Sequence, residues 1–245
     1  MGFYEELSKY YDIVFPTSMM TVKFISDRVK KHSKILDIAC GTGNYSIELS
    51  KLGYKVDGVD LDDEMINNAL NKANENNLKI NFKAGDMRDI HNILKDESYD
   101  MVFCIGNSLV HLQSLKEIEE LIKNIYQITR ENGKIIIQIV NYDRILDFNI
   151  DYLPTISDKD KGIEFIRKYD YDDKDKKVYF NTELVVKRDE RKESYTNSIP
   201  LFPLRVSELE DILKNIGFKR IELYGSFKED KYTKDSFHTI VVAEK

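Results

Sequence analysis

Residues 35–60 place a glycine loop and an acidic residue at a spacing that suits ligand binding. The apolar run Ile35–Ala39 stops at Cys40-Gly41-Thr42-Gly43, which predicts a buried strand followed by a tight loop. A helix is expected next, and a second strand ends on Asp60. The helix start offers unpaired N–H groups, and an acid about 20 residues past the loop can accept both hydroxyls of a ribose. The stretch therefore predicts a nucleotide-binding half unit.

The loop does not match the dinucleotide pattern G-x-G-x-x-G. After Gly41 and Gly43 the third glycine is replaced by Ser46, so close packing of the helix against a pyrophosphate is not provided for. Asp37, near the end of the strand, would repel a pyrophosphate but attract an ammonium group. A nucleoside without phosphates fits better than a nicotinamide cofactor. A tight turn that binds nothing is the alternative interpretation of the two glycines alone.

The third expected strand, residues 80–84, is followed by Gly85-Asp86-Met87. An acid directly after a parallel strand can accept the amino group of adenine while Met87 packs on the ring. Asp86 would then act at the third strand as Asp60 does at the second. A turn or a helix cap is the ordinary alternative for such an aspartate.

Polar loops also follow the fourth and fifth expected strands. Residues 99–105 lead into Gly106–Leu112, and residues 134–140 lead into Asn141–Arg144. In an open α/β sheet, ligands bind at the carboxyl ends of the strands where the strand order reverses, which places the 106–112 loop opposite the Gly41 loop. His111 by itself is equally consistent with a structural hydrogen bond.

Helical periodicity between these strands predicts a doubly wound α/β fold, and strands at 218–224 and 236–243 complete a mostly parallel seven-stranded sheet. Ser114 with Glu117, and Ser207 with Glu210, have the spacing of capping boxes that begin helices. The leading residues 3–30 are expected to form two helices interrupted near Pro16. This segment could cover the glycine loop, with Tyr10, Tyr11 and Asp12 nearest to it; Tyr11 fits the site and the core equally well.

The pattern changes after the fifth strand. Residues 163–171, 177–186 and 193–199 read as three β runs, which predicts a three-stranded antiparallel sheet inserted at 146–200 into a core of 1–145 and 201–245. The sheet could close over a substrate, pair with a second subunit, or simply face solvent.

Bulk properties narrow the function further. The 245 residues carry a net charge of −6, with a pI near 5.4, which argues against a nucleic-acid partner. Cys40 and Cys104 lack C-x-x-C spacing, so neither a metal site nor a disulfide is expected. Neither a signal peptide nor a membrane span is indicated, and we expect a cytoplasmic protein. The sequence is compatible with a homo-oligomer and does not decide the oligomeric state.

Over its whole length the chain resembles class I S-adenosylmethionine-dependent methyltransferases, whose D-x-x-C-G-T-G pattern is present from Asp37 to Gly43. From Gly106 onward it is more similar to the glycine and sarcosine N-methyltransferase group. That likeness rests on the inserted sheet and on three segments: GNSLVHL at 106–112, NYDRIL at 141–146 and YGSFK at 224–228.

The resemblance implies a Rossmann-like fold, S-adenosyl-L-methionine as cofactor, and methylation of a small molecule, most simply at an amine nitrogen. It implies a cofactor site made of Asp37, Cys40, Gly41, Gly43, Asp60, Leu61, Asp86, Met87 and Ile105. Asn107, His111 and Asn141, with Tyr11, would face the transferred methyl group. The group's substrate-binding arginine before the Asn-Tyr-Asp run is Val140 in this chain, and Arg144 follows one helical turn later.

Other functions are still consistent with these residues. An O-methyltransferase or a sugar-amine methyltransferase would use the same cofactor site. A non-catalytic nucleoside-binding regulator would keep Asp60 and Asp86 but would need no polar residues at 106–111 and 141–144. A nicotinamide oxidoreductase would require the glycine that Ser46 replaces.

Overall fold

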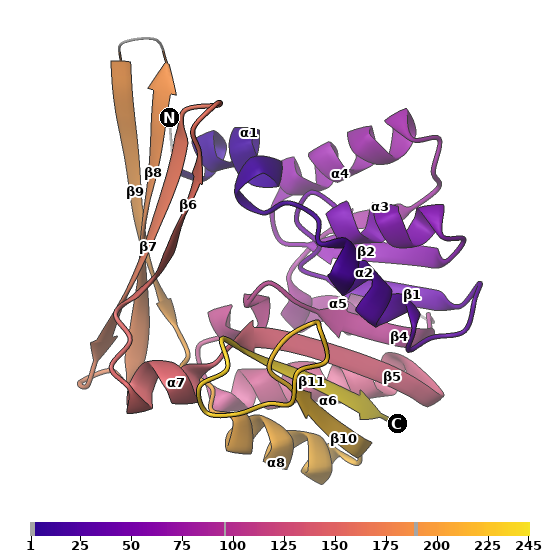
Figure 1. Ribbon diagram of the computed structural model, residues 1–245. Helices are drawn as coiled ribbons and strands as arrows, with labels where there is room; N and C mark the ends of the chain where they lie inside the picture. The colour runs from indigo at the N-terminus through magenta and orange to yellow at the C-terminus, as the bar shows by residue number, and fades with distance from the viewer. Residues whose placement is uncertain (1–2, 96, 189–190) are drawn as a thin grey trace.

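A seven-stranded sheet with helices on its two faces forms the larger part of the structure (Figure 1). The structure is a computed structural model that describes residues 3–95, 97–188 and 191–245. Strands β1 to β5 are parallel to one another, and β11 runs antiparallel between β5 and β10. The predicted mostly parallel sheet is thus confirmed. Across the sheet the strands are β10 (Lys219–Tyr224), β11 (His238–Glu244), β5 (Thr129–Val140), β4 (Tyr99–Cys104), β1 (Lys34–Ile38), β2 (Lys55–Asp60) and β3 (Asn81–Ala84).

Helices cover both faces of this sheet, because its central strands are apolar on both sides. In β1, for example, Ile35 packs with the cluster that contains α2, α3 and α4, while Leu36 packs with the cluster that contains α5, α6 and α8. The helices are α1 (Phe3–Val14), α2 (Met19–Ser26), α3 (Asn44–Lys51), α4 (Asp63–Glu75), α5 (Ile90–Ile93), α6 (Leu115–Ile128), α7 (Tyr142–Asp147) and α8 (Val206–Ile216), with short 3₁₀ turns η1 (Met87–Asp89) and η2 (Ser108–His111). No helix among the described residues is long and apolar enough to cross a membrane.

The two expected helix starts differ in outcome. Ser114 caps α6 by accepting a hydrogen bond from the Glu117 N–H at 3.2 Å, as predicted, but the Glu117 side chain accepts from the Gln113 N–H and not from that of Ser114. The N-cap of α8 is Arg205, whose backbone N–H donates to Glu208 Oε2 at 2.9 Å, so the prediction of Ser207 and Glu210 was wrong. The chain enters α8 two residues earlier because Asp143, on α7, accepts a hydrogen bond from the Val206 N–H at 2.9 Å.

The inserted sheet has four antiparallel strands, not the three that were predicted. In order they are β6 (Tyr152–Asp158), β7 (Ile163–Asp172), β8 (Lys177–Arg188) and β9 (Arg191–Leu201). Strand β6 escaped prediction because it contains Pro154 and has little buried surface. A proline lacks the N–H of a sheet ladder and is tolerated on an edge strand, and the register shifts between Leu153 and Ile156 around it. Pro200, expected to end the insertion, lies within the other edge strand, β9.

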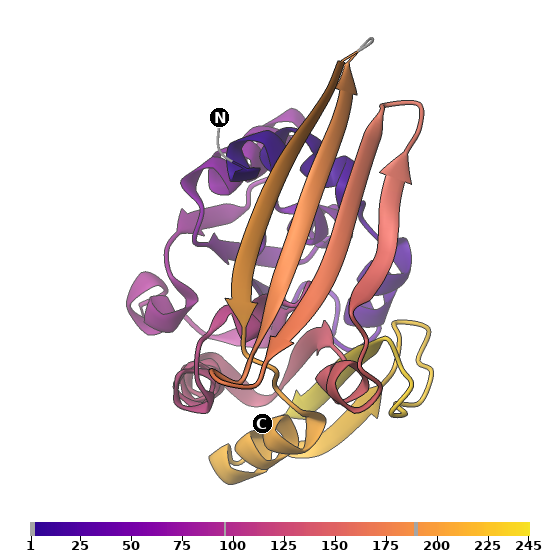
Figure 2. The ribbon, with the colours of Figure 1, turned by 90° about the vertical axis from the view of Figure 1, so that its left-hand side faces the viewer.

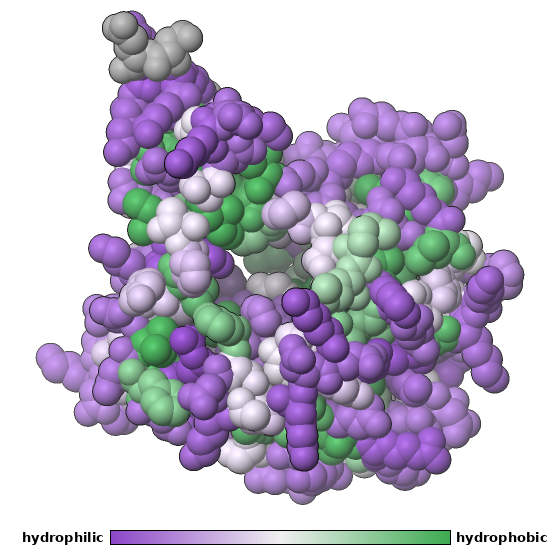
Figure 3. Space-filling view, in the orientation of Figure 1, coloured by the Kyte–Doolittle hydropathy of each residue, from purple (hydrophilic) through white to green (hydrophobic). Residues whose placement is uncertain are grey.

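This second sheet meets the rest of the molecule at its two ends. Near one end, Phe165 and Leu184 pack against Leu7 and Val14 of α1. Near the other end, Tyr169 and strand residues beside it join the main hydrophobic core. Figure 2 shows the four strands side by side in front of the core, and the space-filling view is hollowed between the sheet and the core (Figure 3). The middle of the sheet therefore faces a recess.

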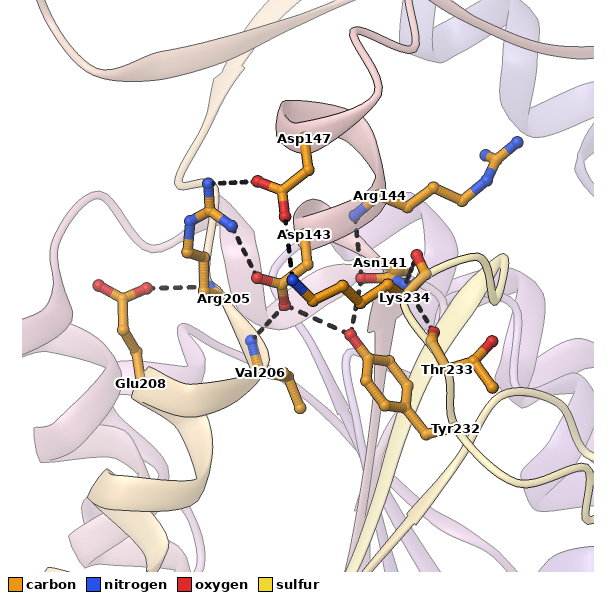
Figure 4. A network of polar contacts seen from close by, with 10 residues as sticks. All are labelled: Asn141, Asp143, Arg144, Asp147, Arg205, Val206, Glu208, Tyr232, Thr233 and Lys234. Carbon is orange, nitrogen blue, oxygen red and sulfur yellow. Dashed lines mark hydrogen bonds and ion pairs between the residues drawn. The ribbon is translucent and has the colours of Figure 1, made fainter.

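A polar network ties together the two chain segments that lead into and out of the second sheet (Figure 4). Asp143 accepts hydrogen bonds from Arg205 Nη1 at 2.8 Å and from the Val206 N–H at 2.9 Å. Arg205 also pairs with Asp147 at 2.9 Å, and the Tyr232 hydroxyl donates to Asp143 at 3.4 Å. Asp143 is 8% exposed, so its charge depends on these donors.

We expect Asp143→Ala to lower the free energy of unfolding by about 2 to 3 kcal/mol, because it leaves buried donors without their acceptor. Chemical denaturation measures the loss. Asp147→Ala is the matched control, since its carboxylate is 33% exposed and should cost less than about 1 kcal/mol. Equal losses in the two variants would contradict the importance given to Asp143.

Candidate functional site

A cavity of about 510 Å³ lies at the carboxyl ends of β1, β2 and β3, beneath α1. Five residues predicted to hold a nucleoside line it, namely Gly41, Asp60, Leu61, Asp86 and Met87. Tyr11 and His111, predicted to lie near the reacting group, line it as well. The switch in strand order between β1 and β4 thus brings these separate loops together, as the sequence indicated.

Six further lining residues had not been predicted: Ala39, Val59, Asp62, Met65, Gly85 and Ser108. Each except Met65 lies within three residues of a predicted site residue, so proximity in sequence was the available signal. Ala39 is the least expected of them, because it adopts a positive φ of 58°, a conformation that is unfavourable for a residue with a Cβ. Met65 reaches the cavity from the first turn of α4.

Gly41 is required by the approach of Tyr11 to the loop after β1. A Cβ at Gly41 would lie 2.9 Å from the Tyr11 hydroxyl, and its φ of 54° also favours glycine. Gly43 does not line the cavity. It adjoins α3, where a Cβ would lie 2.6 Å from the ring of Phe82, so its absence of a side chain serves packing against β3.

Asp60 joins the end of β2 to the glycine loop. Its Oδ2 accepts a hydrogen bond from the Gly41 N–H at 2.7 Å, and its Oδ1 accepts one from the Asp62 N–H at 3.0 Å. Burial raises the pKa of Asp60, an effect that these backbone hydrogen bonds oppose. A carboxylate has about four lone-pair positions, so Asp60 retains capacity for hydroxyl donors from a ligand.

Asp86 combines the two roles that the sequence left open. It caps η1 by accepting a hydrogen bond from the Arg88 N–H at 2.9 Å, and it also borders the cavity. Hydrogen bonds from the Arg88 side chain lower the pKa of Asp86, which keeps the carboxylate ionised and able to accept. Met87 lies next to it on the cavity wall.

Besides Gly43, three residues predicted at the cofactor site are not among the residues that line the cavity, namely Asp37, Cys40 and Ile105. Asp37 is 2% exposed and accepts a hydrogen bond from the Ser46 hydroxyl at 2.7 Å. Burial raises the pKa of Asp37 to about 8. Ser46, which replaces the third glycine, is thus the hydrogen-bond partner of a buried carboxyl group behind the loop.

The two predicted asparagines hold loops and do not border the cavity. Asn107 accepts a hydrogen bond from the Val140 N–H at 2.9 Å and donates to the Tyr142 hydroxyl at 3.2 Å. Asn141 is fully buried, and its amide donates to the Ser236 carbonyl at 2.9 Å and to the Lys234 carbonyl at 3.1 Å. The structure therefore brings Tyr11 and His111 to the cavity but leaves Asn107 and Asn141 outside it.

Tyr11 and His111, the two cavity residues predicted to lie near the reacting group, differ in the protons they can exchange. Burial lowers the pKa of His111, so its imidazole is neutral near pH 7 and can accept a proton. Burial, with the charges of Asp60 and Asp37, raises the pKa of Tyr11. Tyr11 therefore keeps its proton and serves as a hydrogen-bond donor, not as a base.

Helix α1 is fastened over the glycine loop by Asp12. The Thr42 hydroxyl donates to Asp12 Oδ1 at 2.7 Å, and the Lys72 ammonium pairs with Asp12 Oδ2 at 2.9 Å. Asn44 also donates to Asp12 at 2.8 Å. The leading segment is thus placed over the loop, as expected from the sequence, and it closes the cavity with Tyr11.

Comparisons with known proteins agree with this arrangement. A methyltransferase-domain family matches residues 35–133. The chain is 29% identical over 228 residues to a glycine/sarcosine N-methyltransferase of Aphanothece halophytica, covering 91% of this chain and 81% of that protein. It is 26% identical over 223 residues to the putative methyltransferase YqeM of Bacillus subtilis (strain 168), covering 91% and 88%. A solved S-adenosylmethionine-dependent methyltransferase from Clostridium acetobutylicum ATCC 824 has a TM-score of 0.82 at 18% identity, covering 98% of each chain.

These findings support a class I S-adenosylmethionine-dependent methyltransferase. The residues of the cavity suit S-adenosyl-L-methionine as the cofactor. The cavity volume lies in the range of small-molecule sites. Gly41 leaves space between the loop and Tyr11 that any Cβ would narrow, and Asp60 and Asp86 offer acceptors at two separate points along the cavity.

We expect Asp60→Ala to weaken binding of S-adenosylhomocysteine by about 100-fold, because hydrogen bonds to a charged acceptor contribute about 1.5 to 3 kcal/mol. Isothermal titration calorimetry measures the affinity. Asp63→Ala, an exposed carboxylate at the start of α4, is the control and should bind normally. Unchanged affinity in Asp60→Ala would remove this residue from the site.

Asp37 should make stability fall as pH rises. Between about pH 4 and pH 8 the folded state retains a proton that the unfolded chain has released, so the free energy of unfolding declines through this window and levels off above it. The slope is at most about 1.4 kcal/mol per pH unit. Asp37→Asn stays neutral and can still accept from Ser46.

We therefore expect the stability of Asp37→Asn, relative to the unsubstituted protein, to increase from pH 5 to pH 8 in denaturant titrations. Asp211→Asn alters an exposed carboxylate on α8 and should show no such trend. A difference between Asp37→Asn and the unsubstituted protein that does not vary with pH would show that Asp37 is ionised throughout.

Proposed function

We propose that the protein transfers a methyl group from S-adenosylmethionine to a small molecule, at an amine nitrogen. The observation that carries the proposal is the placement of Asp60 and Asp86 in one cavity with Ser108, His111 and Tyr11. The first two residues would bind the ribose and the adenine, and the last three would surround the reacting nitrogen. Asp37, Cys40, Gly43 and Ile105 would support the cofactor loop from behind, and Asn107 and Asn141 would hold the acceptor loops in place.

The bound cofactor supplies an electrophilic methyl group on a sulfonium centre. Because that leaving group needs no protonation, the protein's task is to align an acceptor and to exclude water, and alignment alone can contribute about 7 kcal/mol. Tyr11 and the recess beneath the second sheet serve this purpose. Residues 146–200 would act as a cover over the acceptor, inserted into a cofactor-binding core of 1–145 and 201–245.

An amine acceptor must lose a proton before it can attack. His111 is suited to receive it, since burial keeps the imidazole neutral and the side chain borders the cavity. The cofactor would be bound whether or not His111 acts, so the two roles are separable by experiment.

The names of similar proteins support nitrogen as the acceptor. Two relatives, from Aphanothece halophytica and Halorhodospira halochloris, are named glycine/sarcosine N-methyltransferases, at 29% and 28% identity. An oxygen or sugar-amine acceptor is the closest competing proposal, because Asp60 and Asp86 would be used in the same way for either.

Incubation with methyl-labelled S-adenosylmethionine and matched panels of amines, amino sugars and alcohols tests the proposal. We expect label in an amine product, located at nitrogen by mass spectrometry. Transfer to hydroxyl acceptors alone would overturn nitrogen specificity. Binding of the cofactor without transfer to any panel would favour a regulator.

We expect His111→Gln to lower kcat by about 100-fold, within the range of general-base catalysis, with little change in cofactor affinity. In the unsubstituted enzyme kcat should rise with pH through the lowered pKa of His111, below 6.5, and the variant should lose this limb of the profile. Unchanged kinetics would exclude His111 as the base.

A further inference from the structure

Arg167 lies halfway along the face of the second sheet that is turned toward the core. Its neighbours on the same face of β7 are Phe165 and Tyr169, which are buried against α1 and against the main core respectively. Side chains two residues apart on a strand share a face. Arg167, between these two contacts, therefore faces the recess that separates the sheet from the core (Figure 3).

The guanidinium of Arg167 is largely without partners in the part of the chain that the structure describes. Nη2 donates to the Pro154 carbonyl at 2.6 Å. Nε is fully buried and has no hydrogen-bond partner, and none of the ion pairs among the described residues involves this arginine. The side chain as a whole is half-buried, but a buried N–H without an acceptor is costly to the fold, so the unpaired Nε points to a ligand.

Packing connects the region of Arg167 to the cavity. Tyr169, its neighbour on the same face of β7, belongs to the hydrophobic cluster that also contains Leu109 and Val110. These two residues lie in sequence between Ser108 and His111, which line the cavity. The positive charge of Arg167 also contributes to the lowered pKa of His238, for which burial is the larger cause.

We propose that Arg167 binds an anionic group of the methyl acceptor, with a carboxylate as the fitting class. The inference rests on the proposed function, because the acceptor must enter the recess beside the cavity. A guanidinium carries five N–H donors in a planar fork that matches a carboxylate. An anion there would supply the acceptor that Nε lacks and would pair with the positive charge of the guanidinium.

The position of Arg167 separates it from the other cation nearby. Arg144, on α7, stacks its guanidinium on the Phe237 ring at 4.5 Å, and its side chain extends away from the polar network (Figure 4). Lys168 is adjacent in sequence but exposed on the opposite face of β7. Arg144 is therefore the control for a positive charge on another element, and Lys168 is the control for a positive charge on the same strand.

Nuclear magnetic resonance of the full-length protein, saturated with S-adenosylhomocysteine, provides a test that is independent of turnover. The Nε–Hε signal of Arg167 is assigned by its loss in Arg167→Lys, and acetate is then titrated against neutral acetamide. We expect a saturable shift with acetate and none with acetamide, retained in Arg144→Met and Lys168→Met. No saturable shift, or an equal response to acetamide, would overturn the proposal.

Kinetics provide the second arm, with acceptors in matched pairs such as glycine and glycinamide. Arg167→Met should raise KM for the acid by about 10- to 100-fold while kcat and the KM of the amide change little. Lys168→Met should leave both unchanged. A loss confined to Arg144→Met would assign the anion to Arg144 and overturn the role of Arg167.

The failure of this inference can be distinguished from failure of the proposed function. If calorimetry shows no binding of S-adenosylhomocysteine, the methyl-transfer proposal fails. If the cofactor product binds but the Arg167 signal does not respond to acetate, only the anion site is excluded.

Discussion

The hydrogen bond between the Gly41 N–H and the Asp60 carboxylate, 2.7 Å long, is the contact on which the site depends. It joins the loop after β1 to the end of β2, next to the backbone hydrogen bond from the Cys40 N–H to the Val59 carbonyl at 3.0 Å. The loop contains positive φ angles at Ala39 and Gly41, which are retained only where surrounding contacts hold them. With the loop held, Tyr11 packs over Gly41 and the cavity has a closed wall.

In the second sheet, the residues that stabilise the fold and the residue proposed to bind a ligand lie in different places. Apolar side chains bury its two ends, near Phe165 and near Tyr169, and the Asp143 network secures the segments that attach it. These contacts stabilise a sheet whose middle carries Arg167, which has no anionic partner among the described residues. Firmly packed ends can offset the cost of one unpaired cation.

Much of the fold could be predicted from sequence because its signals are local. Most strands of the main sheet contain a short apolar run, and the residues at or after the strand ends supplied Gly41, Asp60, Asp86 and His111 in advance of the structure. Strand β6 was missed because Pro154 and an exposed edge give no such signal. The start of α8 was misplaced because the Asp143 carboxylate, more than 60 residues earlier in the chain, determines where that helix begins.

The sequence by itself determined the architecture and the first half of the site, since strand periodicity and the spacing from Gly41 to Asp60 are encoded within a few tens of residues. The tertiary structure alone decided that Asp37 is buried against Ser46, that Asn141 holds the 233–236 segment, and that Arg167 faces the recess. These outcomes depend on which distant segments pack together and on the burial that results. Neither the identity of a residue nor its local sequence pattern shows which distant residues it will contact once it is buried.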